Sequence, residues 1–375
     1  MKLVCFQQEL SNALQIVSKA SGGKVLDSLY RHILLKATGN ELILIGTGGE
    51  LVIKKSIPVE NLEETGELAV PGMELLSLII NFPPGLVTLR KENTQILISN
   101  EGIVYRLHTL SPELFPPLPT IEEGNSFQLS GLELKELIRE TSFAVAPAEE
   151  IKSSYKGVLI EGEEQKLIAV ATDTRRLCVK TIPTITPIKK PFKVIVPKRA
   201  LVEIQRNLTD EKEDTVKIEI SGPYILFQKK TLEILSHLIE GEFIDYRTVL
   251  PKRDAITQVI TLFREEVNNA LKRASIMAQG LELPNLVRLS LKSQTLIITA
   301  ETQDLGQAYE EVSIREETKP LEIMFNSRYL LEVLGVLSCE EIRVSFTNSE
   351  GPILIQPVGK DNYIYLAMPI KLEEE

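Results

Sequence analysis

The sequence repeats one pattern three times, at intervals of 124 to 133 residues. Each copy begins with a short apolar stretch and continues into a helix with apolar residues at positions i, i+4 and i+7. A second predicted helix follows about 65 to 70 residues later in each copy. Such a triplication favours three similar domains over one large core. The first patterns begin at Leu3, Phe127 and Ile260, and the second at Val70, Val196 and Phe325.

Short β-rich runs separate the predicted helices in every copy, and each run leads into a polar turn. We therefore predict an α+β fold with three repeated domains, each with two helices packed on antiparallel sheets. The alternative is three unrelated α+β stretches that align by chance. Proline-containing linkers near residues 111–125 and 250–254 place the predicted domains at 1–125, 126–254 and 255–375.

The charge balance argues against a protein that simply coats nucleic acid. The chain has 42 basic and 52 acidic side chains and a formal net charge of −10. Half of the lysines and arginines nevertheless lie within residues 126–254, and an acidic protein can still present a local basic face to phosphates.

Cysteine usage and hydropathy predict a cytoplasmic location. The three cysteines are far apart in the sequence, which gives neither a disulfide framework nor a zinc-binding spacing. No apolar run is long enough to cross a membrane, and the N-terminal residues do not resemble a signal peptide.

Sequence motifs for catalysis are absent. The chain has no phosphate-binding glycine loop, no nucleophile elbow and no metal-binding HExxH or DxDxDG motif. Paired acidic residues are abundant, but adjacent surface carboxylates are usually solvated. A repeat protein of this kind is more naturally a scaffold or binding surface than an enzyme, and we expect no cofactor and no metal.

Three segments outside the predicted helices carry unusual patterns. They read ATDTRRL at residues 171–177, FIDYRTVLP at 243–251 and MPIKL at 368–372. With FPPLP at 115–119 and FNSRYLLEVL at 325–334, they resemble the family of bacterial DNA polymerase III beta subunits, the sliding clamps. The resemblance extends over essentially the whole chain, through Leu372, and agrees with the threefold repeat.

This resemblance implies a replication processivity factor without catalytic activity. Clamps of this family are head-to-tail homodimers in which six similar units surround duplex DNA, with helices around the hole and sheets outside. A heterologous contact of this kind closes into a ring when the rotation is right. The resemblance places the dimer interface at Tyr105 and Leu107 on one side and at Ile276 and Met277 on the other.

The resemblance also implies sequence-independent contacts with double-stranded DNA. Basic residues on the inner face of such a ring hold phosphates weakly, so that the ring slides. The family positions correspond to Lys24, Lys198, Arg199 and Arg206. The sequence departs from other members in the helix predicted over Gly72–Phe82, which has no basic residue, and at Ser153 and Ser154, which replace two tyrosines.

A second implied site is a pocket between the second and third domains that binds short peptides. Its expected partners are the replicative DNA polymerase alpha subunit, the clamp loader and other proteins with a clamp-binding motif. We expect apolar side chains such as Leu177 to form a hollow and Arg176 to bind polar parts of the peptide. The implied residues are Tyr155, Thr172, Thr174, Arg175, Arg176, Leu177, Ile244, Thr248, Val249, Tyr329, Met368, Pro369, Ile370, Lys371 and Leu372.

The peptide site departs from the family pattern at several positions, so its preferred peptide is expected to differ. The family's Gly-His is Thr174-Arg175 here, a proline is Ile244, and an arginine is Thr248. Two other functions stay open at this point. One is a clamp-like paralogue that binds peptides without encircling DNA, which the net charge of −10 favours. The other is an enzyme, which would need a converging set of titratable groups.

Overall fold

The computed structural model describes residues 1–21, 28–147, 152–211, 214–279, 285–303 and 305–371. These residues form two compact units, each of which combines parts of more than one repeat. Unit 1 comprises Met1–Gly131, Ile185–Lys189 and Arg199–Leu238. Unit 2 comprises Leu132–Thr184, Lys190–Lys198 and Ile239–Glu375.

Unit 1 contains a five-stranded and an eight-stranded antiparallel sheet. The five-stranded sheet has the order β5 (Asn61–Glu64), β1 (Lys2–Phe6), β7 (Leu86–Glu92), β8 (Gln95–Asn100) and β9 (Ile103–His108). The eight-stranded sheet has the order β10 (Asn125–Ser130), β15 (Thr215–Ser221), β16 (Tyr224–Lys229), β17 (Leu232–His237), β4 (Leu51–Pro58), β3 (Glu41–Thr47), β2 (His32–Thr38) and β6 (Gly66–Pro71).

Unit 2 contains a second eight-stranded sheet and a long two-stranded one, both antiparallel. The eight-stranded sheet has the order β14 (Phe192–Pro197), β11 (Gly157–Glu163), β12 (Lys166–Thr172), β13 (Arg176–Pro183), β23 (Tyr363–Ala367), β22 (Ile353–Pro357), β21 (Glu341–Phe346) and β18 (Gln258–Phe263). The two-stranded sheet pairs β19 (Leu286–Thr302) with β20 (Gly306–Asn326).

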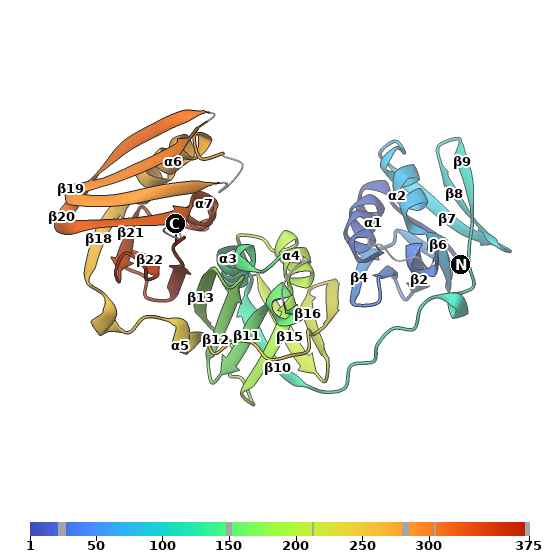
Figure 1. Ribbon diagram of the computed structural model, residues 1–375. Helices are drawn as coiled ribbons and strands as arrows, with labels where there is room; N and C mark the ends of the chain where they lie inside the picture. The colour runs from blue at the N-terminus through green and yellow to red at the C-terminus, as the bar shows by residue number, and fades with distance from the viewer. Residues whose placement is uncertain (22–27, 148–151, 212–213, 280–284, 304, 372–375) are drawn as a thin grey trace. The chain divides into compact units, whose positions relative to one another are not determined.

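Apart from the short α5, the helices fall in equivalent places of the three repeats. In unit 1, α1 packs on β3 and β4, and in unit 2, α6 packs on β19 and β20 (Figure 1). The bounds are α1 (Gln7–Ser21), α2 (Gly72–Ile80), α3 (Gly131–Thr141), α4 (Lys198–Arg206), α5 (Tyr246–Val249), α6 (Arg264–Ile276) and α7 (Ser327–Val336). Short 3-10 helices cover Ser28–Arg31, Pro112–Leu114, Ser142–Ala144, Ser153–Lys156 and Arg253–Ala255.

The helix faces predicted from apolar periodicity are the buried faces. In α1, Leu10, Leu14 and Val17 have no exposed surface, and they follow the i, i+4, i+7 rule. The prediction of an α+β fold with two helices per repeat is confirmed. The helix predicted over Gly72–Phe82 ends two residues earlier, at Ile80, where Asn81 forms the C-cap.

Each eight-stranded sheet contains four strands from one repeat and four from the next, and the two sets pair in the middle of the sheet. In unit 1, β17 pairs with β4, so a strand from residues 126–254 continues a sheet that began in residues 1–125. In unit 2, β23 pairs with β13 in the same way. The two junctions are therefore equivalent positions in the repeat.

Two lysines are buried inside the units, and each is paired with a carboxylate. The Lys180 Nζ lies 2.6 Å from Glu140 Oε2 in unit 2, and the Lys229 Nζ lies 2.6 Å from Asp214 Oδ2 in unit 1. Removing one partner of such a pair leaves an uncompensated buried charge, which is strongly destabilising. These lysines therefore belong to the interior and are not available to bind phosphate.

Helix α7 is capped at its N-terminus by Asn326. The Asn326 side chain accepts a hydrogen bond from the Arg328 N–H at 3.0 Å. We expect Asn326→Ala to destabilise unit 2 by about 1 kcal/mol, because the N–H loses its partner. Urea denaturation followed by circular dichroism measures this loss. Asn326→Asp keeps the acceptor and should retain the wild-type midpoint; an equal loss in both variants would contradict the capping role.

Candidate functional site

The turn between β12 and β13 is held by its own side chains. The Asp173 carboxylate accepts hydrogen bonds from the N–H groups of Arg175 and Arg176, both at 3.0 Å. The Thr172 hydroxyl donates to the Arg176 carbonyl at 2.6 Å and accepts from the Thr174 N–H at 3.1 Å. Thr174 has a φ of 74°, which a β-branched residue rarely adopts and which glycine adopts freely. The hydrogen bonds offset this strain.

Arg176 points into the interior and holds three segments together. Its side chain is 5% exposed and forms ion pairs with Asp173, at 2.9 Å, and with Glu332. It also donates to the Phe143 carbonyl at 3.0 Å and lies over the Tyr329 ring at 4.6 Å. Arg176 is thus fully used inside unit 2, and the exposed arginine at this turn is Arg175.

The charges around Arg176 keep it ionised despite its burial. Burial opposes the charged guanidinium, but Tyr365 and the hydrogen bond with Glu332 outweigh burial and raise the pKa of Arg176. Burial likewise opposes the charged Glu332 carboxylate, yet hydrogen bonds from Arg328 and Arg176 lower its pKa. Glu332 therefore links the turn to α7 as a stable anion.

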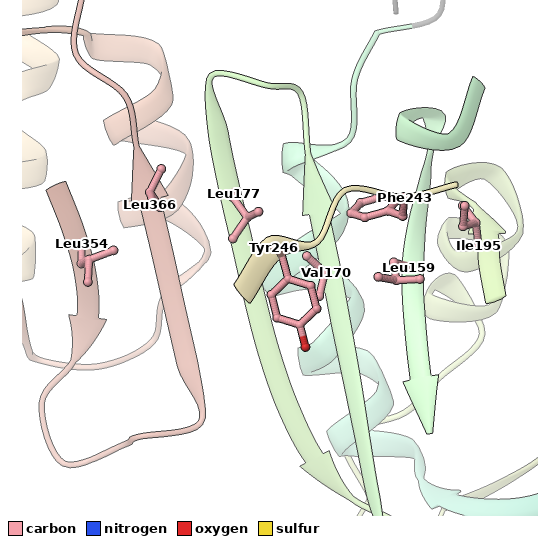
Figure 2. Close-up of a cluster of buried hydrophobic side chains, with 8 residues drawn as sticks. All are labelled: Leu159, Val170, Leu177, Ile195, Phe243, Tyr246, Leu354 and Leu366. Carbon is pink, nitrogen blue, oxygen red and sulfur yellow. The ribbon is translucent and has the colours of Figure 1, made fainter. Parts of the chain in front are cut away.

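An apolar cluster lies at the junction of β13 and β23, beside this turn. Leu177 is 2% exposed and is paired with Leu366 across the two strands. Figure 2 shows the segment with Phe243 and Tyr246 crossing over the strands that carry Leu159 and Val170. The buried members are Leu159, Val170, Leu177, Ile195, Phe243, Tyr246, Leu354 and Leu366, and partly buried residues packed on them include Tyr155, Val249 and Met368.

The segment over the cluster is anchored by the charged residues of the FIDYR motif. Asp245 caps α5 by accepting from the Arg247 N–H at 3.2 Å. The Tyr246 hydroxyl and the Arg247 guanidinium both donate to Glu161 Oε2, at 3.1 and 2.7 Å. Burial, with a contribution from Glu161, raises the pKa of Tyr246 to about 12. The motif thus fixes two aromatic rings on the sheet.

The residues after β23 form the third side of the cluster. The Met368 N–H donates to the Arg175 carbonyl at 2.9 Å, which ties the C-terminal segment to the β12–β13 turn. The Ile370 N–H donates to the Met324 carbonyl at 2.8 Å. Three segments that are far apart in the sequence therefore meet around Leu177.

The sequence-predicted peptide residues occupy three kinds of positions. Leu177, Tyr155, Val249 and Met368 belong to the cluster or pack on it, whereas Thr172 and Arg176 are buried and bonded internally. Leu372 lies outside the described residues. The exposed ones are Thr174, Arg175, Ile244, Thr248 and Lys371, and the half-buried ones are Tyr329, Pro369 and Ile370.

The predicted DNA-binding residues differ in how free their charges are. Arg206 is exposed and pairs with Glu203 at 2.7 Å. Arg199 donates to two carbonyls in the last turn of α1, at 2.6 and 3.1 Å, and so joins α4 to α1 within unit 1. Lys198 is half-buried, and its pKa is lowered by burial and by the charge of Arg176. Lys24 lies outside the described residues.

The predicted interface residues lie at exposed edges of their units. In unit 1, Tyr105 and Leu107 belong to β9, the edge strand of the five-stranded sheet, and Tyr105 is 47% exposed. In unit 2, Ile276 ends α6 and is 57% exposed, and Met277 is its C-cap. Exposed apolar residues on an open strand edge are typical of an interaction surface.

Several residues of the site were not predicted as site residues. Phe243 and Tyr246 lie in the FIDYRTVLP motif, and the sequence signal was their apolar character within a linker. Leu366 and Leu354 join the cluster through sheet pairing, which no local pattern reveals. Glu332 carries no signal in the sequence that distinguishes it from other acidic helix residues, and only its ion pair with Arg176 assigns it to the site.

Comparisons with known proteins agree along the whole chain. Family models of the DNA polymerase III beta subunit match in order: the N-terminal domain at residues 1–119, the central domain at 128–245 and the C-terminal domain at 247–371. The beta sliding clamp of Pseudomonas putida is 30% identical over 370 residues, 98% of each chain. That of Lactococcus lactis is 28% identical over 372 residues, 96% of each chain.

Solved structures show the same relation. A sliding clamp from Pseudomonas aeruginosa, solved with griselimycin bound, has a TM-score of 0.93 at 28% identity and covers 99% of this chain and 100% of its own. The Bacillus subtilis clamp has a TM-score of 0.93 at 27% identity, with 99% of each chain covered.

The three repeats and their sheets define a clamp built from three beta-clamp domains. The chain belongs to the family of bacterial DNA polymerase III beta subunits, the beta sliding clamps. It is a DNA replication processivity factor and a non-catalytic subunit of DNA polymerase III. Within the described residues, no helix is both long and apolar enough to cross a membrane.

Proposed function

We propose that two copies of the chain join head to tail in a ring around double-stranded DNA and hold partner proteins at the Leu177 cluster. The domains of the ring are residues 1–125, 126–254 and 255–375. Three similar domains in each of two chains give a ring of six, and the exposed apolar residues on β9 and α6 support a heterologous contact. The partners are the polymerase alpha subunit, the clamp loader and other proteins with a clamp-binding motif.

The observation that carries the docking site is the meeting of three segments around Leu177. Apolar side chains from the β12–β13 turn, from the α5 segment and from the C-terminal segment converge there. Because Leu177 is 2% exposed, a docked peptide must displace a side chain that packs on the cluster, such as Met368. Methionine is suited to this because its unbranched chain repacks easily.

The exposed Arg175 replaces Arg176 as the residue that meets polar parts of the peptide. Arg176 is used by Asp173, Glu332 and the Phe143 carbonyl, whereas the Arg175 side chain is exposed beside Met368. Its backbone is fixed on both sides, by Asp173 and by the Met368 N–H. Arg176 supports the site by positioning the turn.

DNA contacts in this ring are weak and independent of base sequence. Each phosphate contact releases counterions, so that log affinity falls with log salt by about 0.9 per contact. We expect Lys198→Gln with Arg206→Gln to reduce this slope by about 2. Fluorescence anisotropy on two unrelated duplexes of equal length measures it at several salt concentrations.

The matched control removes two positive charges elsewhere, by Lys36→Gln with Lys91→Gln, and should leave the slope unchanged. An equal change in both double variants would mean that net charge, and not these positions, sets the binding. Strong discrimination between the two duplexes would contradict a sliding function. Arg199→Gln is tested separately, because Arg199 also holds the end of α1.

A clamp-like scaffold that binds peptides without encircling DNA is the second candidate. The net charge of −10 and the absence of basic residues from α2 favour it. The deciding experiment is topological trapping on nicked circular DNA with a clamp loader present. A ring stays on the circle and is lost when the circle is linearised; equal retention on both forms, or on neither, would reject the ring.

A further inference from the structure

Unit 1 contains a second apolar cluster that repeats the Leu177 cluster position by position. Val52 is paired with Leu235 across β4 and β17, as Leu177 is paired with Leu366 across β13 and β23. Four more pairs of members follow the same strand registers, and one pair of phenylalanines lies in the segments that cover the two clusters. The members Leu34, Ile45, Val52, Ala69, Phe115, Leu226 and Leu235 correspond in this order to Leu159, Val170, Leu177, Ile195, Phe243, Leu354 and Leu366.

The covering segment differs between the two clusters, and the difference leaves a hollow in unit 1. Over the Leu177 cluster the chain forms α5, and the Tyr246 ring is buried. At the equivalent place the segment FPPLP has prolines at 116, 117 and 119, which lack the N–H groups that a helix needs. Tyr246 has no counterpart among the buried members of the second cluster.

The hollow is a cavity of about 260 Å³ with apolar walls. Typical pockets for drug-sized ligands range from roughly 300 to 1,000 Å³, so this cavity suits one or two side chains. The ion pair between Lys54 and Glu233, at 3.3 Å, lies at its wall. The apolar lining residues are Ile45, Val52, Leu118, Pro119, Ile121, Leu226 and Leu235.

The segment over residues 113–123, which forms one rim of the cavity through Leu118, Pro119 and Ile121, is acidic. The chain has no lysine or arginine between Arg106 and Lys135, and within this stretch Glu113, Glu122 and Glu123 are exposed. The lysine that lines the cavity, Lys54, is already paired. The equivalent segment over the Leu177 cluster carries both signs of charge, with Glu240, Glu242 and Asp245 beside Arg247, Lys252 and Arg253. The two clusters thus have similar floors, and the segment over the unit 1 cluster differs in having acidic residues without basic ones.

We propose that this cavity is a second peptide-docking site, which takes an extended partner segment with an aliphatic anchor flanked by lysine or arginine. The anchor fills the space between Leu118 and the floor at Val52 and Leu235. The basic flanks meet Glu122 and Glu123. Peptide binding at this cavity requires neither the ring nor an occupied Leu177 cluster. The test of this site is therefore independent of the test of the proposed function.

The test uses the full chain with ¹³C-labelled methyl groups on isoleucine, leucine and valine. The probes are the synthetic peptides KKLSLKK and EELSLEE, acetylated and amidated at their ends. We expect KKLSLKK to shift the methyl signals of Val52, Leu118 and Leu235 and to leave those of Leu177 and Leu366 in place. EELSLEE should bind at least ~10-fold more weakly, because the acidic rim repels it.

Two exposed leucines of the same segment provide a matched pair of variants. Leu118 is 38% exposed and lines the cavity, whereas Leu114 is 54% exposed and is not among the lining residues. Leu118→Arg should reduce KKLSLKK affinity at least ~10-fold, and Leu114→Arg, with the same added charge, should reduce it less than ~2-fold. Glu122→Lys with Glu123→Lys should reverse the preference between the peptides.

Three results would overturn the site. One is no binding of KKLSLKK up to millimolar concentration. Another is a set of shifts confined to the Leu177 cluster, which would assign the peptide to the other docking site. The third is an equal loss of affinity in Leu118→Arg and Leu114→Arg. That result would mean that the added positive charge, and not the cavity, explains the loss.

Discussion

A Leu177→Asp variant is expected to lose at least ~100-fold in affinity for a clamp-binding peptide and to keep its oligomeric state. The substitution places an unpaired carboxylate among apolar side chains at the base of the cluster, and desolvating it costs several kcal/mol. Calorimetry with a peptide from the polymerase alpha subunit measures the affinity, and light scattering measures the mass. Clamp loading and polymerase processivity should fail together, because we propose that both partners use this site.

The equivalent residue of unit 1 provides the control for a folding defect. Val52→Asp places the same carboxylate at the same strand position of the other eight-stranded sheet, where the residue is also buried. It should cost similar stability and leave affinity for the polymerase peptide unchanged. A dimeric Leu177→Asp variant with wild-type peptide affinity would remove Leu177 from the site. Equal losses in both variants would point to misfolding and not to docking.

Local patterns in the sequence were enough to predict the helices. The buried face of α1 follows from the spacing of Leu10, Leu14 and Val17, and α7 begins two residues after Phe325, where its pattern was predicted to begin. Both features depend on neighbours within one or two helical turns, which the sequence displays directly. The threefold repeat extended these local signals to the number of domains.

The joining of the sheets could not be predicted from the same signals. The β4–β17 and β13–β23 pairs join strands about 180 residues apart in the sequence, and their alternation of apolar residues fits many partners. The second cluster, built at the first of these junctions, was therefore not predicted. Its segment FPPLP was noted only as part of a linker and for the resemblance.

The roles of Arg175 and Arg176 show why a motif alone does not assign a site residue. Both are arginines in one motif, and the resemblance placed both at the peptide site. The Arg176 side chain, and not that of Arg175, donates to Asp173, and Glu332 and the Phe143 carbonyl, distant in sequence, hold it in the interior. An exposed and a buried arginine differ in tertiary contacts that the motif does not contain.

The second large effect is expected at the proposed dimer interface. Ile276→Asp with Met277→Asp should convert the dimer into monomers, because each carboxylate loses its water in the interface without gaining a partner. A cost of about 2 kcal/mol for each carboxylate weakens one interface about 1,000-fold. Sedimentation velocity at micromolar concentration measures the change. Ile185→Asp, at an apolar residue of similar exposure in unit 1, should remain dimeric.

A mixture of two monomeric variants distinguishes a head-to-tail contact from a symmetric one. Tyr105→Asp should also be monomeric, and it keeps the α6 side of the interface, whereas the Ile276→Asp, Met277→Asp variant keeps the β9 side. In a head-to-tail arrangement the mixture has one intact interface per pair, so a dimer returns that is open and weaker than the wild-type ring. In a symmetric arrangement each interface would join the same patch of both chains, so every interface in the mixture would contain an altered patch and no dimer would return. Failure of the mixture to dimerise, with each variant folded by circular dichroism, would reject the pairing of β9 with the end of α6.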